Sequence, residues 1–182
     1  MGTRIGLTGL TRSFWRNRRG ATVVEFAIIA PVFFGLTFSI LEAGFYFFVT
    51  SAVDAANTKA ARLIRTGQAV NGGRSKQQFY DEICKTVKFV GDCSSRLTVD
   101  VARFNNFSDL AADTSNPTCA DASAADITNI PYDTGADRDI IRVRVCFIYD
   151  GFNPGVGLNL EKSADGKGRK MISTSIFRNE PF

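Results

Sequence analysis

A run of 16 uncharged, mostly apolar residues near the start of the chain constrains its fold most. It extends from Phe26 to Leu41, with Glu25 before it and Glu42 after it. The apolar residues 21–24 and 43–49 lengthen it past the roughly 20 residues that a membrane-spanning helix needs. At a rise of about 1.5 Å per residue the two glutamates lie about 25 Å apart, so both fit the interfaces of a bilayer. The sequence therefore predicts one transmembrane helix.

The charge of the first 20 residues predicts how that helix is oriented. This segment contains no acidic residue and five arginines: Arg4, Arg12, Arg16, Arg18 and Arg19. Positive residues stay on the cytoplasmic side, so the chain after residue 50 is expected outside. The formal net charge of +4 comes from this segment, because all 18 acidic residues follow it. A folded nucleic-acid-binding domain carries its basic charge on its own surface, so no nucleic-acid partner is predicted.

The residue types present do not point to an enzyme. The chain contains no histidine, and it lacks the glycine-rich phosphate loops and the G-x-S-x-G motif. Asp133, Asp137 and Asp139 are possible calcium ligands, but their spacing differs from the EF-hand pattern. We therefore predict no catalytic residue, no metal site and no cofactor.

The rest of the chain predicts a small α+β domain. An apolar stripe continues the helix, and Asp54, Asn57, Lys59, Arg62 and Arg65 form its expected polar face, with Gly67 as its stop. Ser75 and Gln78 form a capping-box pattern that opens a second, short helix. Alternating residues then predict three strands, near 97–102, 141–149 and 171–177, which form an antiparallel sheet against the long helix. The fold class is thus α+β, with a helix over about 21–66 and a small antiparallel β-sheet domain containing one short helix.

Four cysteines, all after residue 80, predict two disulfides: Cys84, Cys93, Cys119 and Cys146. A Cys119–Cys146 bond would attach the acidic segment 105–137 to the central strand, and Cys84–Cys93 would close a short loop. Three pairings are possible, and the spacing does not choose among them.

The start of the helix resembles a known processing site. The segment RNRRG-ATVVE-FAIIAP has a basic leader, Gly20, and a glutamate, Glu25, five residues later, which resembles a type IV prepilin cleavage site. Residues 20–67 resemble the TadE-like family of Tad (Flp) pilus proteins, and the features that match include Phe26, Pro31 and Glu42. The C-terminal residues 177–181 are similar to the tail of the same family.

This resemblance implies a minor pilin or pseudopilin with a pilin-like fold. It implies cleavage between Gly20 and Ala21 by the Tad prepilin peptidase, with Glu25 acting in both processing and assembly. The expected partners are that peptidase, other Tad minor pilins, the major Flp pilin and the inner membrane. The expected parts are a leader over 1–20, the helix over 21–66 and a disulfide-bonded domain over 67–182. That domain is periplasmic, or extracellular within the pilus, and the protein acts in pilus assembly or initiation and in adhesion.

Other interpretations make different predictions about the leader. In an uncleaved, signal-anchored binding module the leader stays attached, and the acidic segment binds a ligand or a surface. A secretory signal peptide is instead removed near residue 44 or later, although no A-x-A exit site is present. An anchored extracytoplasmic enzyme needs convergent carboxylates, and no pair in the sequence is distinguished for that role.

Overall fold

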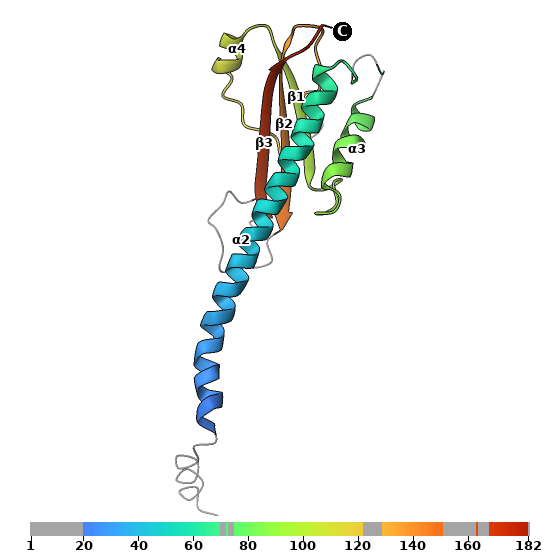
Figure 1. The fold of residues 1–182 in the computed structure, drawn as a ribbon. Coiled ribbons are helices and arrows are strands. Elements are labelled where there is room, and N and C mark those ends of the chain that lie inside the picture. The colour runs from blue at the N-terminus through green and yellow to red at the C-terminus, as the bar shows by residue number, and fades with distance from the viewer. Residues whose placement is uncertain are drawn as a thin grey trace, which may run out of the picture. The chain divides into compact units, whose positions relative to one another are not determined.

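The computed structural model describes residues 20–69, 72, 75–121, 129–150, 163 and 168–181. The predicted basic leader thus lies outside the described residues, apart from Gly20. The chain divides into two compact units, one through Leu41 and the other Glu42–Phe182. Helix α2 begins in the first unit and ends in the second (Figure 1).

Helix α2 extends over Ala21–Arg65, close to the predicted bounds of 21–66. The helix continues through Pro31. Gly67 follows its last turn, as predicted for the helix stop. Gly67 has a φ of 70°, a conformation that glycine adopts without steric cost. Its amide donates to the carbonyl of Ile64 at 2.9 Å, which satisfies one of the last carbonyls of the helix.

Three antiparallel strands form the predicted sheet: β1 (Leu97–Phe104), β2 (Ile140–Asp150) and β3 (Gly168–Arg178). Strand β2 lies in the centre of the order β1-β2-β3. Its Val145 pairs with Val99 of β1 and with Ser173 of β3. Because side chains alternate across a strand, these three residues point to the same face of the sheet.

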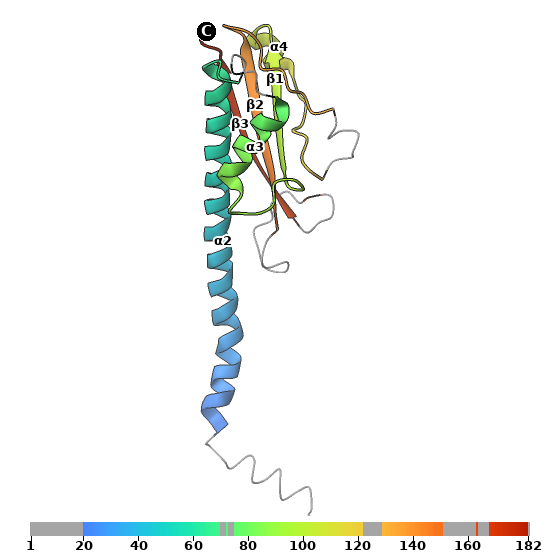
Figure 2. The ribbon, with the colours of Figure 1, turned by 90° about the vertical axis from the view of Figure 1, so that its right-hand side faces the viewer.

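The core lies between that face and two helices. Figures 1 and 2 show the second half of α2 and helix α3 (Lys76–Val87) on the same side of the sheet. The predicted helical stripe is buried there, and only Leu63 is partly exposed. The fully buried side chains of this layer include Val53, Ile64, Phe79, Ile83, Val101, Val143 and Phe147. The fold class α+β is therefore confirmed.

The capping box at the start of α3 is present as predicted. The Ser75 hydroxyl accepts from the Gln78 amide, and the Gln78 side chain accepts from the Ser75 amide. A second short helix, α4 (Phe107–Ala112), was not expected from the sequence. Asn106 caps it by accepting from the amide of Asp109 at 2.8 Å. The described part of the domain thus contains two short helices rather than one.

The assignment of Asn57 to the exposed face of α2 is wrong. Its side chain is buried against β3, where it donates to the hydroxyls of Ser173 at 3.0 Å and Ser175 at 2.9 Å. A polar side chain tolerates burial when it is hydrogen-bonded. Asn57 therefore holds the helix to the edge strand at a defined register.

Candidate functional site

The most apolar part of α2 is also its most exposed part. Between Val23 and Leu41 every large apolar side chain is 46–72% exposed. Soluble proteins rarely leave so long an apolar surface in contact with water, so this segment requires lipid or another protein around it. Within the described residues, α2 is the one helix long and apolar enough to cross a membrane, and its most apolar stretch contains no buried residue.

The two hydroxyl side chains of this segment are hydrogen-bonded to the helix itself. The hydroxyl of Thr37 donates to the carbonyl of Phe33, and that of Ser39 to the carbonyl of Gly35, each at 2.8 Å. Hydrogen bonds of this kind allow a helix to enter a layer without water, where an unpaired donor is costly. The segment therefore has the properties of a membrane anchor.

The residues of the predicted cleavage site lie at the start of the helix. Gly20 is exposed, directly precedes α2, and has open space around the position of a Cβ. Ala21 is the first helical residue, and Glu25 and Phe26 are exposed one turn further on. Pro31 is exposed in the next turn.

Glu42 differs from Glu25 in its surroundings. It is half-buried at the start of the second unit, and its Oε2 atom has no hydrogen-bond partner. Burial raises the pKa of Tyr149 on β2, and the negative charges of Glu42 and Asp150 add to this effect. Nearby charges of the same sign oppose ionisation. The structure thus brings Glu42 close to the sheet.

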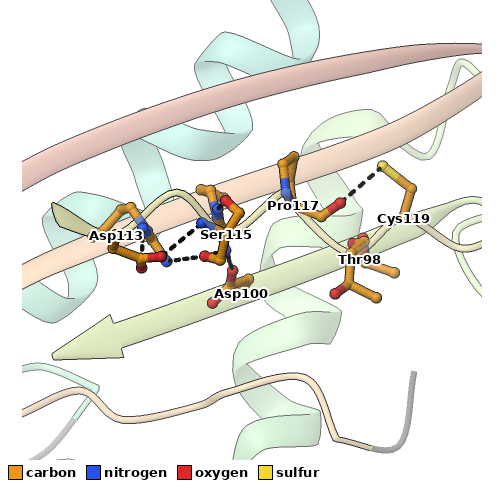
Figure 3. Close-up of polar contacts among 9 residues, drawn as sticks. Thr98, Asp100, Asp113, Ser115, Pro117 and Cys119 are labelled. Atoms are coloured by element: carbon orange, nitrogen blue, oxygen red, sulfur yellow. Dashed lines mark hydrogen bonds and ion pairs between the residues drawn. The ribbon is translucent and has the colours of Figure 1, made fainter. Parts of the chain in front are cut away.

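The second face of the sheet carries a buried ionic network (Figure 3). Arg144 of β2 donates through Nε to Asp100 Oδ2 of β1 at 2.8 Å, and through Nη1 to the carbonyl of Ser115 at 2.6 Å. Arg142, two residues before Arg144 on the same face of β2, donates to Asp113 at 2.7 Å. The segment 113–119 therefore runs along β2 over this face of the sheet and covers both arginines.

Hydrogen bonds hold the pKa of Asp113 at about 2, below its usual range. The largest contribution to the lowered pKa comes from the Ser115 amide, which donates to Asp113 Oδ1 at 2.7 Å. Hydrogen bonds from the Ser115 hydroxyl and from Arg142 lower it further. On α3, the pKa of Glu82 is also about 2, because Lys59 and Lys85 both donate to it. Donors that favour the charged form lower the pKa of a carboxyl group.

Two disulfides complete the domain, and the structure resolves their pairing. Cys84 of α3 bonds Cys93, and Cys119 bonds Cys146 of β2. The second bond attaches the covering segment to the central strand. No described cysteine is free.

The aspartates considered for calcium have protein partners. Asp133 and Asp139 lie within 3.4 Å of Arg103, and Asp139 also accepts from the Ala136 amide. Asp137 is exposed in a turn. Within the described residues no group of three acidic or cysteine side chains is placed to hold a metal ion.

The C-terminal tail connects two elements of the domain. Asn179 is buried and donates to the carbonyls of Thr134 and Ala136, at 3.0 and 2.8 Å. Glu180 pairs with Arg65 at the end of α2, with 3.0 Å between Oε1 and Nε. The tail that resembles the family thus fixes the helix end and the turn before β2.

These features define a helix-anchored α+β protein whose anchor is an exposed apolar helix. A family model described as TadE-like protein matches residues 20–62, which confirms the resemblance found in the sequence. The match covers about a quarter of the chain, and it consists of Gly20 and α2 as far as residue 62. It associates the chain with pilin-like proteins of Tad pili, which are structural rather than enzymatic. No curated protein and no solved structure matches.

Proposed function

We propose that this chain is a minor pilin or pseudopilin of a Tad pilus, made as a prepilin and cleaved between Gly20 and Ala21. One observation carries the proposal: the segment that matches the TadE-like family includes the exposed apolar half of α2. Such a surface serves two successive environments, the bilayer before assembly and the helices of other subunits afterwards.

The position of Gly20 suits cleavage. It is exposed and directly precedes the helix, so a protease has access to the bond on its C-terminal side. Cleavage removes the basic leader and leaves a free amine at Ala21. A positive charge is unfavourable at a helix N-terminus, because the helix dipole is positive there too.

Glu25 supplies the charge that this amine requires. It is the fourth residue after Ala21, so both lie on the same side of the helix. In an assembly, the Glu25 carboxylate pairs with the amine of a neighbouring subunit, and a buried charge is tolerable when it is paired. Removing the carboxylate therefore weakens assembly even where cleavage still occurs.

The proposed topology follows from the charges around the helix. The N-terminus lies in the cytoplasm, and the disulfide-bonded domain lies in the periplasm or, within a pilus, outside the cell. The proposed partners are the prepilin peptidase, the other Tad minor pilins and the major Flp pilin. Pilus initiation and adhesion are the proposed cellular roles.

Variants at two glycines test the processing step. Neither glycine has an atom within 4 Å of an added Cβ, so substitution at either leaves the fold intact. Gly20→Val is expected to block cleavage, whereas Gly35→Ala in the same helix is expected to be cleaved normally. Cleavage of both variants would contradict the assignment of the site, and loss of cleavage in both would indicate a general defect.

Surface piliation tests the role in assembly. A deletion strain is expected to lose or reduce its pili, and the parent gene is expected to restore them. Glu25→Gln is expected to restore fewer pili than the control Asp54→Asn, which changes an exposed acid of the same helix. Normal piliation with Glu25→Gln and an attached leader on the parent protein would favour the signal-anchored binding module.

A further inference from the structure

Three phenylalanines are exposed where α2 enters the domain. Phe47 is 67% exposed, Phe48 is 52% exposed, and Phe89, which follows α3, is 62% exposed. The rings of Phe48 and Phe89 touch, with 5.4 Å between their centroids. Two segments about 40 positions apart in the sequence thus form one apolar surface, which we call the Phe89 surface.

The turn that presents Phe89 is well braced. The backbone amide of Lys88 caps α3 by donating to the carbonyl of Cys84 at 2.8 Å, and the Val90 amide donates to the carbonyl of Val87 at 2.9 Å. The Cys84–Cys93 disulfide closes the same turn. Phe89 is therefore held outward by the fold, and its exposed apolar surface is unfavourable in water.

The position of Phe48 along the helix identifies what covers this surface. Phe48 is six residues beyond Glu42, or about 9 Å along the axis. The headgroup layer extends about 5–7 Å beyond each side of the hydrocarbon core, so a core that ends near Glu42 places the Phe48 backbone about 2 Å above that layer. Aromatic side chains of a helix point back toward its N-terminus, which brings the Phe48 ring into the layer. Aromatic rings concentrate at this depth in membrane proteins.

The charges around Phe89 suit phospholipid phosphates. Lys88 is exposed, and no described carboxylate pairs with it. Lys85, one turn earlier, pairs with Glu82 at 2.7 Å and remains 69% exposed. The nearby acid, Asp92, keeps its negative charge, because hydrogen bonds from Ser94 lower its pKa, and Arg96 partly offsets that charge.

We infer that the Phe89 surface docks onto the outer leaflet of the membrane, with Phe48 and Phe89 in the headgroup layer and Lys88 against anionic phosphates. Before assembly the domain therefore contacts the bilayer at two places, through α2 and through the turn after α3. The inference rests on the proposed membrane insertion of α2.

Lipid quenching of single tryptophans tests this contact. The only native tryptophan, Trp15, is replaced by Phe in the full chain. One tryptophan is then introduced as Phe89→Trp, as Phe34→Trp in the apolar half of α2, or as Phe107→Trp. Phe107 is a matched control, because it is 60% exposed on α4 at the other end of β1 (Figure 1). Each protein is reconstituted into anionic phospholipid vesicles that contain both lipids brominated near the headgroup and lipids brominated near the ends of the acyl chains.

The fluorescence of the Phe89→Trp chain is expected to fall at least half as much as that of the Phe34→Trp chain. The Phe107→Trp chain is expected to change by less than a tenth. Adding Lys88→Glu to Phe89→Trp is expected to reduce the quenching about twofold.

Three outcomes would overturn the inference. Equal, weak quenching at positions 89 and 107 with strong quenching at 34 would leave the anchor intact and exclude the contact. Shielding of position 89 from both lipid and aqueous iodide would show a protein–protein contact instead. Absence of quenching at all three positions would contradict membrane insertion itself.

Discussion

Replacing Asp100 with leucine tests the ionic network on the second face of the sheet. Asp100 is 3% exposed and Arg144 is 8% exposed, so neither charge is well solvated. Asp100→Leu leaves the guanidinium buried with only the Ser115 side of its contacts. Breaking a buried ion pair at one partner costs about 3–5 kcal/mol. That is a large part of the ~5–15 kcal/mol by which a typical domain is stable.

The double variant Asp100→Leu/Arg144→Met separates the cost of an unpaired charge from the value of the pair. It removes both charges and loses mainly the hydrogen bond to Ser115, so we expect a cost of about 1 kcal/mol. The exposed control Asp54→Leu is expected to change stability by less than about 0.5 kcal/mol.

Denaturant unfolding of the detergent-solubilised chain, with disulfides intact and sheet content followed by circular dichroism, gives these free energies. A cost below about 1 kcal/mol for Asp100→Leu would refute the reasoning, since breaking a buried pair is expected to cost about 3–5 kcal/mol. A double variant as unstable as the single one would refute it too.

Two further predictions concern the same domain. The pKa of Asp113 is about 2 when folded and about 3.9 when unfolded, so its contribution is present above pH ~4 and lost as the pH falls toward 2. Asp113→Asn should therefore lower stability at neutral pH and flatten the loss between pH 4 and 2, as measured by unfolding across that range. Opening Cys119–Cys146 by serine substitution should cost about 3.6 kcal/mol, against about 2.7 for the shorter Cys84–Cys93 loop. Equal unfolding midpoints for the two disulfide variants would contradict that ordering.

Local patterns in the sequence predicted most of the fold. Gly67 ended α2, and the Ser75 capping box opened α3, because both signals act through the neighbouring backbone. The alternation in β2 separated its two faces correctly. These features depend on residues within one or two turns of each other.

The features that the sequence did not predict depend on distant partners. Asn57 resembles any polar residue of an amphipathic helix until Ser173 and Ser175 are placed opposite it. The disulfide pairing depends on how the segment 113–119 runs along β2, which spacing along the chain does not define. The cap of α4 did have a local signal, since Asn106 precedes Asp109 by three residues within an acidic segment that was not assigned to a helix.

The candidate site shows the same division. Gly20, Glu25 and the apolar run were recognised from their spacing alone, and the family match over residues 20–62 includes them. The Phe89 surface was not recognised, because Phe48 and Phe89 meet only after α3 packs beside α2.

The intact mass of the protein purified from native membranes tests the central claim most directly. The account predicts a chain that begins at Ala21, without the leader. A leader that stays attached in a strain with an active prepilin peptidase would contradict the account, as would a chain that begins near residue 44 or later.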